Sequence, residues 1–218
     1  MTKRNILFAL LLLYSSCCFA QTGAPNDQLI ISPDISNGGI VPRRMIATAD
    51  GGFLTAGSNG AQGYISRSNA AGQEIWTKFY LFGDDTDLNS LIELPSGNIA
   101  AVGTCLNCAP GDLSQKALIL QTDANGTLLR DTTLGRNGLH AQGKDLVLAN
   151  NSKIAVTGQV VTAGGFAPSN AFLTVLDEQL QLEFWTEHHA LFYDIGNALV
   201  RTGDGGYAIA GWSLANLT

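Results

Sequence analysis

Apolar and polar residues alternate in short blocks along most of this chain, and four of these blocks share one layout. In each, a turn is followed by an apolar stretch that ends in glycine, at residues 51–57, 97–103, 152–158 and 205–211. The final glycines are Gly57, Gly103, Gly158 and Gly211, so successive repeats are 46, 55 and 53 residues apart. A period of this length indicates that one supersecondary unit is stacked several times.

The spacing of turns predicts four strands in each repeat. They cover 45–49, 53–57, 63–67 and 73–80 in the first repeat, 90–94, 99–103, 117–122 and 127–133 in the second, and 145–149, 154–158, 171–176 and 182–188 in the third. Turns at 69–72, 123–126 and 177–180 each precede a last strand, and the third turn has Leu180 where the others have glycine, which predicts a different turn type. No stretch after the first 20 residues has a helical period, so the chain is predicted to be all-β.

The second strand of the repeats predicts how the sheets pack. In repeats two to four both of its faces are mainly apolar, which indicates a strand that is covered on both sides. Small residues precede the final glycines, at Ala56, Ala101, Ala155 and Ala210. They favour a strand near an axis where neighbouring sheets converge. Radially arranged four-stranded blades meet both conditions.

Two sequence elements of the repeat resemble a known family. The first is the strand pair that begins Thr-x-Asp-Gly-Gly-aromatic, at 48–53 and 202–207, and the second is a hairpin that ends in tryptophan, at 69–76 and more weakly at 123–126 and 177–185. Together they resemble the β-propeller-like repeats of exported bacterial proteins over about residues 40–218. The resemblance implies an array of four-stranded antiparallel blades, with about three and a half blades present. It does not imply one activity, because this fold serves scaffolds, binding modules and enzymes.

The first residues are typical of an export signal. Lys3 and Arg4 precede an apolar run at 6–13, and a small-residue cleavage site at 18–20 predicts a mature chain that begins at Gln21. We therefore divide the chain into a signal peptide (1–20), an N-terminal segment (21–39) and the repeat domain (40–218), and expect it to be secreted or held at the cell surface. Lipidation of Cys17 or Cys18 is the alternative, although the position three residues before each lacks the expected aliphatic residue.

Charge narrows the choice of partner. The net charge is −6, and removal of the first 20 residues takes away two bases and no acid, which leaves −8. Nucleic acid needs a basic face, so it is excluded as a partner. The acidic residues are spread along the chain, as on a soluble secreted protein. No apolar stretch reaches the roughly 20 residues of a membrane-spanning helix.

Two clusters are candidates for structural or metal chemistry. Cys105 and Cys108 are the cysteines that remain after export, and in an oxidising compartment they are expected to form a disulfide in the loop after a strand. Free thiols, a redox pair or a metal site are the alternatives. Asp84, Asp85, Asp87 and Asn89 form the densest acidic cluster, in the connection between the first two repeats. Their oxygens suit Ca²⁺, but the glycine and the final acid of a helical calcium loop are missing, so a solvated loop competes with this reading.

Aromatic residues and histidines supply the remaining candidates. Trp76 and Trp185 end equivalent strands and are expected to pack between blades, whereas Trp212 has no counterpart in the other repeats. An exposed Trp212 would stack on a sugar ring or cover a neighbour. His188 and His189 are adjacent on a strand and point to opposite faces, so at most one can share a site with His140. No nucleophile or phosphate-binding motif is present in a convincing context.

The fourth repeat is short by two strands. It stops after 207–212, which predicts an incomplete array, and residues 29–32 would supply one outer strand by circular closure. The function we expect is a non-enzymatic, exported scaffold or binding module that presents loops to a protein or glycan. The alternatives are a polysaccharide-acting hydrolase or lyase with its site on the propeller rim, and a part of a larger multidomain protein.

Overall fold

The computed structural model describes residues 18–21, 28–31, 39–108, 110–136, 138–162 and 168–215. Residues 1–17 of the predicted signal peptide lie outside these ranges. Strand β1 (Cys18–Gln21) pairs antiparallel with β2 (Gln28–Ile31), and β2 contains most of the predicted closing strand. Because the expected cleavage after residue 20 removes three of the four β1 residues, the role of β2 in the exported chain stays a prediction.

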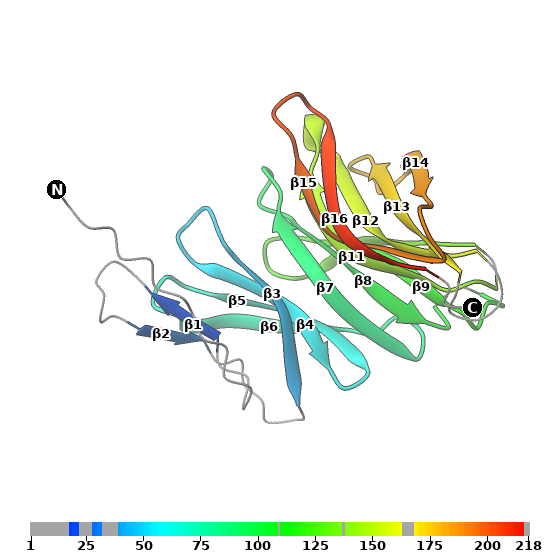
Figure 1. The fold of residues 1–218 in the computed structure, drawn as a ribbon. Helices are drawn as coiled ribbons and strands as arrows, with labels where there is room; N and C mark the ends of the chain where they lie inside the picture. Colours follow the sequence, from blue (N-terminus) through cyan, green and yellow to red (C-terminus); the bar gives the residue numbers. More distant parts are fainter. Residues whose placement is uncertain are drawn as a thin grey trace.

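The described chain is built from antiparallel sheets, as the apolar pattern predicted (Figure 1). Three successive meanders of four strands follow one another along the sequence. The first contains β3 (Ile40–Ala47), β4 (Phe53–Asn59), β5 (Gln62–Ser68) and β6 (Glu74–Tyr80). The second contains β7 (Asp85–Glu93), β8 (Ile99–Leu106), β9 (Gln115–Thr122) and β10 (Leu128–Leu134). The third contains β11 (Ala141–Leu148), β12 (Ile154–Val161), β13 (Ser169–Leu176) and β14 (Leu182–His188).

The fourth repeat is a hairpin of β15 (Tyr193–Arg201) and β16 (Tyr207–Leu214). One parallel pair, Ser169 with Tyr193, joins β15 to β13, so the third and fourth repeats form a single six-stranded sheet. Within the described ranges the sheets form an open series and no closed ring (Figure 1). No helix in the same ranges is long and apolar enough to cross a bilayer.

Successive sheets pack face to face through shared apolar cores. Leu54 and Ile65 of the first sheet lie in one cluster with Leu91 and Ile99 of the second. The next cluster joins residues of β8 and β9 to residues of β12 and β13, and a smaller one joins Ala155 of β12 to Leu199 of β15. The second strands of the first three repeats are therefore covered on both faces, as predicted for the second and third, and every residue of β12 is buried. The same prediction is wrong for the fourth repeat, because β16 is exposed along most of its length.

Trp76 and Trp185 pack as expected from their equivalent positions. Each is partly buried against a core that two neighbouring sheets share. The indole of Trp185 also stacks on Phe172 of β13, with ring centroids 4.6 Å apart. The tryptophan that ends these hairpins therefore anchors an outer strand to the core.

The repeated turns are local features that the sequence encodes. Asp50 accepts hydrogen bonds from the Thr48 hydroxyl (2.5 Å) and the Gly52 amide (3.2 Å), and Asp204 accepts the same pair from Thr202 and Gly206. The Thr-x-Asp-Gly-Gly motif is thus one turn used twice.

The prediction of a different turn at Leu180 is wrong. Leu180 adopts φ +60° and donates its amide hydrogen bond to Asp177 O at 3.0 Å, as Gly126 (φ +77°) does to Asp123 O at 3.1 Å. The left-handed backbone costs a leucine about 1–2 kcal/mol. Its side chain is 2% exposed in the core between the second and third repeats, and this burial offsets the cost.

The first strand of each repeat begins earlier than predicted. In the first three repeats it starts at Ile40, Asp85 and Ala141, four or five residues before the expected positions. Asp85, Asp87 and Asn89 consequently lie on strand β7 and not in a loop, and Cys105 lies within β8. In each of these first strands, one β-bulge interrupts the alternation of apolar and polar residues.

Candidate functional site

Each of the four first strands carries a β-bulge at an equivalent place. Register shifts against the second strand occur between Pro42 and Arg44, Leu88 and Ser90, Gly143 and Asp145, and Gly196 and Ala198. The extra residues are Arg43, Asn89, Lys144 and Asn197, all of them polar. A bulge turns a side chain in a new direction and interrupts the strict alternation of apolar and polar residues. For this reason the sequence pattern did not predict the start of these strands.

The repeated glycine in the second strand of each repeat lies opposite the bulge in the first strand. A Cβ atom would lie 2.1 Å from the carbonyl oxygen of Val41 at Gly57, 1.9 Å from that of Asp87 at Gly103, 1.9 Å from that of Gln142 at Gly158 and 1.8 Å from that of Ile195 at Gly211. The sequence pattern attributed the small residues Ala56, Ala101, Ala155 and Ala210, next to these glycines, to neighbouring sheets that converge. At the glycines themselves the crowding comes from the bulge within the same sheet. The most regular feature of the sequence therefore marks the position of the bulges.

The bulges of the first three repeats open onto one polar cavity, which we call the bulge groove. It has a volume of about 190 Å³. Its polar lining comes from β3, β7, β8, the start of β9 and β11: Arg43, Asp85, Asp87, Asn89, Thr104, Gln115, Gln142 and Lys144. Side chains from three consecutive repeats therefore meet at one place, about 100 residues apart in sequence.

Charge within the bulge groove is mixed. Arg43 Nη2 pairs with Asp87 Oδ2 at 2.8 Å, and the other carboxylate oxygen of Asp87, Oδ1, is buried without a hydrogen-bond partner in the described residues. Burial lowers the pKa of Lys144, Asp87 opposes this shift, and Arg43 adds to it. No hydrogen bond or ion pair joins the Lys144 ammonium to another described residue. The groove therefore holds one free acceptor and one free donor of opposite charge.

Hydrogen bonds between repeats hold the walls of the groove. Asn89 Nδ2 donates to Gly143 O at 2.7 Å, which links the second and third bulges. Gln142 Nε2 donates a hydrogen bond to Gln115 Oε1 at 3.0 Å. The backbone amide of Gln115 donates to His140 Nδ1 at 3.1 Å. The histidine singled out in the sequence thus supports a wall, and the bulge residues are held in fixed relative positions.

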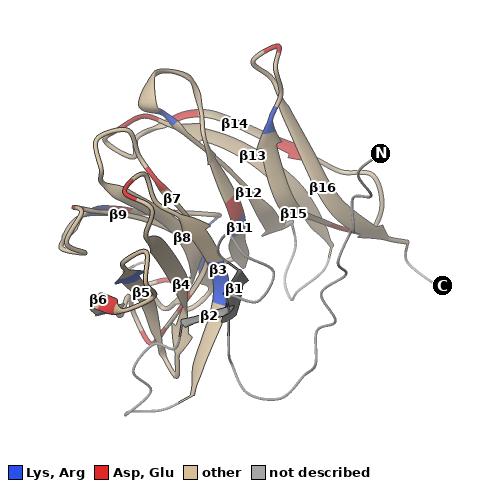
Figure 2. Cartoon of the chain, turned by 90° about the vertical axis from the view of Figure 1, so that its left-hand side faces the viewer, with Lys and Arg blue, Asp and Glu red and all other residues tan. Residues whose placement is uncertain are grey.

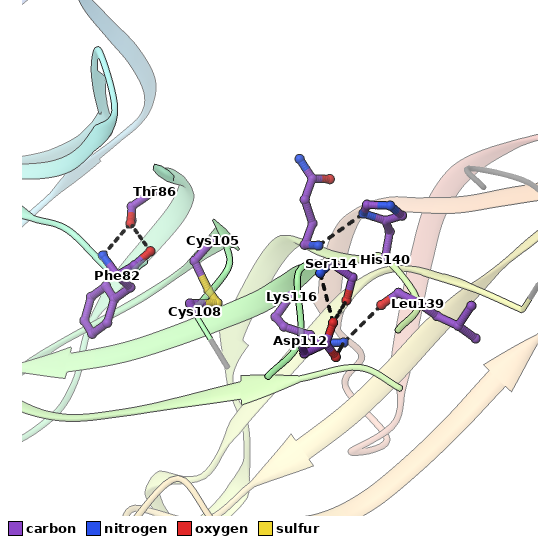
Figure 3. Close-up of a disulfide and its surroundings, with 10 residues drawn as sticks. Phe82, Thr86, Cys105, Cys108, Asp112, Ser114, Lys116, Leu139 and His140 are labelled. Carbon is purple, nitrogen blue, oxygen red and sulfur yellow. Dashed lines mark hydrogen bonds and ion pairs between the residues drawn. A yellow bond between two sulfur atoms is a disulfide. The ribbon is translucent and has the colours of Figure 1, made fainter. Parts of the chain in front are cut away.

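A buried ion pair anchors the chain just before this wall (Figure 3). Lys116 Nζ lies 2.7 Å from Asp112 Oδ2, and both side chains are almost fully covered. Asp112 also accepts hydrogen bonds from the Ser114 amide (2.9 Å) and the Gly138 amide (2.9 Å). Hydrogen bonds hold the pKa of Asp112 well below its usual range. The one from Lys116 contributes most, and the one from the Ser114 hydroxyl contributes the next largest part. The connections that precede β9 and β11 are therefore fixed together.

Cys105 and Cys108 form a disulfide at the end of β8, with an S–S distance of 1.98 Å (Figure 3). Leu106, between them, lines the bulge groove and accepts a hydrogen bond from the Asp84 amide at 2.9 Å. The connection between the first two repeats is thereby held against the disulfide loop, and the disulfide shapes one border of the groove.

The predicted calcium ligands are only partly brought together. Asp85, Asp87 and Asn89 occupy alternate positions of β7 and all line the bulge groove, whereas the Asp84 carboxylate accepts a hydrogen bond from Asn107 Nδ2. In the described ranges no group of three or more His, Cys, Asp or Glu side chains is placed to hold a metal ion. Arg43 already pairs with the central carboxylate, so it would compete with Ca²⁺ for Asp87. Calcium binding at this place stays a prediction.

Trp212 lies at a second, larger cavity of about 540 Å³ between β16 and the outer part of the third repeat. Its indole is 47% exposed and stacks on Tyr193, with ring centroids 5.1 Å apart. His188 lines the same cavity, while His189 Nδ1 lies 3.7 Å from Asp194 Oδ2. A role for Trp212 in ligand binding stays a prediction.

Comparison with known proteins assigns no relative. A scan against models of protein families finds no match to the chain, and a search of curated protein sequences finds none either.

Arg43 and Lys144 are the charged groove residues that sequence reasoning missed, and Thr104, Gln115 and Gln142 were missed as well. Each of the two cations lies in a short strand beside another charged residue, Arg44 or Asp145, so neither belongs to a motif. One signal was nevertheless present: each lies 14 residues before a repeated glycine, as Asn89 and Asn197 do. Alignment of the four repeats on those glycines would have placed four polar residues in one column.

Proposed function

We propose that this chain is an exported, non-enzymatic β-propeller-like binding module, and that the bulge groove binds a sugar unit of a glycan. The stacked four-stranded meanders support a propeller-like array, because each sheet covers the apolar face of the next. The signal-like start and the disulfide support an oxidising compartment outside the cytoplasm.

The observation that carries the proposal is the pairing of a free acceptor with a free donor in the groove. Asp87 Oδ1 requires a hydrogen-bond donor, and the half-buried Lys144 ammonium requires an acceptor. A hydroxyl group is both at once, so a sugar ring with adjacent hydroxyls meets both demands. A single small ion meets only one of these two demands, and an apolar ligand meets neither.

Size and position agree with this ligand class. A cavity of 190 Å³ has the volume of about six water molecules in the liquid, which suits one sugar ring but not a folded protein segment. Arg43 and Gln142 extend the polar lining on either side and would contact neighbouring units of a chain. Net charge favours neutral glycans over strongly acidic ones.

Binding is favoured over hydrolysis by the placement of the carboxylates. A glycosidase needs two carboxyl groups that flank the scissile bond. Both carboxylates of the groove, Asp85 and Asp87, come from one strand, and the charged residues contributed by the first and third repeats are the cations Arg43 and Lys144. The enzymatic alternative therefore lacks the second carboxylate on the opposite side.

The binding test uses the full chain, expressed with its own N-terminus and purified after export. A panel of neutral oligosaccharides is screened on an array, and hits are measured by titration calorimetry against Asp87→Asn, Lys144→Met and the control Lys153→Met, whose ammonium pairs with Glu183 at 2.5 Å on an exposed surface. We expect the two groove variants to weaken binding about tenfold or more, because each removes one charged hydrogen bond of about 1.5–3 kcal/mol. The control should stay within about twofold.

Three results would overturn the proposal. The first is the absence of any glycan that binds the wild-type protein, and the second is glycan binding that the groove variants leave unchanged. The third is release of reducing sugar from a bound glycan, which would favour the hydrolase. Export is read from the same preparation, because N-terminal sequencing should begin at Gln21.

A further inference from the structure

A further polar cavity lies between the second and third repeats, at the end of β7 that points away from the bulge groove. It has a volume of about 150 Å³. We call it the turn pocket, because the β7–β8, β11–β12 and β13–β14 turns form most of its walls. Its polar lining includes Ser96, Asn98, Gln121, Arg130, Ser152 and Gln179. Both repeats that enclose it have all four strands of a meander, so the pocket lies inside the array and not at its end.

Gln121 of β9 is the residue that indicates a ligand in the turn pocket. It is 5% exposed, and it lies on the face of β9 whose earlier members, Ala117 and Ile119, belong to the core shared with the third repeat. Its Oε1 atom is buried, and no hydrogen bond joins either end of the side-chain amide to another described residue. A buried amide without partners destabilises a fold, so such a group in a native protein indicates a bound water or ligand.

The first repeat shows what the same place holds when it is filled. The counterpart of Gln121 there is Arg67, because each pairs with the second residue of the second strand of its repeat. Arg67 Nη2 pairs with Asp50 Oδ2 at 2.9 Å, and Arg67 Nη1 lies 3.6 Å from Glu93 Oε1. In the β7–β8 turn the position of Asp50 is taken by Ser96, which cannot form this ion pair. The turn pocket is therefore the space that shorter, neutral side chains leave between two repeats.

Charge at the turn pocket is balanced. Arg130 Nη1 donates a hydrogen bond to the backbone carbonyl of Glu178 at 2.6 Å, and the guanidinium forms no ion pair with a carboxylate of the described chain. Its other N–H groups remain available to an acceptor in the pocket. The Glu178 side chain adds one negative charge to the lining. Basic and acidic residues are also interspersed over the sheets as a whole, as Figure 2 shows, so a neutral ligand is favoured over an ion.

The turn pocket thus requires a neutral group that donates one hydrogen bond and accepts another. The donor must reach Gln121 Oε1, and the acceptor must reach the Arg130 guanidinium. Leu94, which is 7% exposed, and Pro95 add an apolar wall. A hydroxyl group would meet the first demand and leave this wall uncovered. An acetamido group combines an N–H donor, a carbonyl acceptor and a methyl group, so it matches all three parts of the lining.

We propose that the turn pocket binds the acetamido group of an N-acetylated amino sugar. A volume of 150 Å³ equals that of about five water molecules in the liquid. It admits an acetamido group and part of the ring that carries it, but not a polypeptide that continues on both sides of the amide. The hydroxyls of the ring would contact polar residues of the turns, such as Ser152 and Gln179. This site lies apart from the bulge groove and does not rest on ligand binding there.

Ligand-observed NMR with the full-length protein is the direct test. N-acetylglucosamine is compared with glucose and glucosamine, which lack the acetyl group, and with N-acetyl-lysine, which has the acetamido group on a different carrier. We expect saturable binding of N-acetylglucosamine in the low millimolar range and at least about tenfold weaker binding of the other three compounds. The acetyl methyl protons should receive the strongest saturation transfer, because they contact the apolar wall.

Protein variants identify the pocket that binds. Gln121→Met removes the amide and keeps the length of the side chain, and Gln73→Met makes the same change at an exposed glutamine of the first repeat. We expect Gln121→Met to weaken binding about tenfold or more, and Gln73→Met to leave it within about twofold. The double change Ser96→Asp with Gln121→Arg rebuilds the ion pair of the first repeat, so it should fill the pocket and abolish binding.

The stability of Gln121→Met separates loss of binding from loss of fold. Because the amide has no partner in the unliganded protein, its removal should leave the urea midpoint unchanged or raise it. A clear fall of the midpoint would show that a bound water or a protein group already satisfies the amide, and would overturn the proposal.

Three binding results would also overturn it. One is the absence of N-acetylglucosamine binding up to about 100 mM, and another is tighter binding of N-acetyl-lysine, which would indicate an acetylated polypeptide as the ligand. The last is binding that Gln121→Met retains. If Asp87→Asn removes that binding, the sugar occupies the bulge groove, so failure of this proposal is distinguished from failure of the proposed function.

Discussion

The substitution Gly158→Ala tests the link between the repeated glycine and the bulge. A Cβ atom at this position would lie 1.9 Å from Gln142 O and 2.9 Å from Phe172 Cε1, whereas van der Waals contact needs more than about 3.4 Å. The phenyl ring can rotate, but the carbonyl belongs to β11 just before the bulge at Lys144. Relief of the clash therefore requires the β11–β12 ladder to open locally.

The size of the effect follows from two opposing contributions. Overpacking of a core costs about 1–3 kcal/mol, and a backbone obstacle places this site at the upper end of that range. Replacing glycine by alanine also stiffens the unfolded chain, which returns about 0.4–1 kcal/mol. We therefore expect a net loss of about 2–2.6 kcal/mol in the free energy of unfolding.

Urea unfolding, followed by circular dichroism, measures this loss. With a denaturant slope of about 3 kcal/mol per molar for a chain of this size, the midpoint should fall by about 0.7–0.9 M. Gly203→Ala is the matched control, because a Cβ atom at Gly203 meets nothing within 4 Å. An unchanged midpoint for Gly158→Ala, or an equal fall for the control, would refute the account of the repeated glycines.

Two further predictions concern the supports of the groove. The folded-state pKa of Asp112 lies below its ordinary value of 3.8, so its stabilising effect is complete above that value and is lost as the pH falls below it. The thermal midpoint should drop on acidification below about pH 4, and Asp112→Asn should flatten this drop; a variant with the wild-type slope would contradict the role of Asp112. Cys108→Ala removes the cross-link to Cys105, which closes a loop of about four residues, so the free energy of unfolding should fall by about 2 kcal/mol. A reducing agent should lower the urea midpoint of the wild type by as much as the substitution does. It should leave the urea midpoint of the variant unchanged.

Much of the local structure could be predicted because its causes are local. The turns at Asp50 and Asp204 follow from a hydroxyl, a carboxylate and two glycines within five residues. The starts of the apolar second strands, predicted at 99 and 154, were placed correctly because a turn immediately precedes each one, although the strands extend three residues further than predicted. Leu180 shows the limit: a left-handed leucine is disfavoured locally, and only its burial against the neighbouring repeat makes it acceptable.

The candidate site was predicted in part. Asp87 and Asn89 were singled out as oxygen ligands, but Arg43 and Lys144 were not, and these two cations change the chemistry that the carboxylate can perform. No local pattern reports that residues 43, 87 and 144 meet. Their meeting depends on the face-to-face packing of three sheets and on the bulges that turn the side chains toward one another.

The amino-acid sequence alone determined the repeat, the all-β class, the turns and the apolar faces, because each depends on the conformational preferences and spacing of residues close together in the chain. Tertiary structure alone decided which charged residues share a groove. Their meeting depends on how whole sheets stack, and that stacking brings together residues that are about 50 positions apart in the sequence.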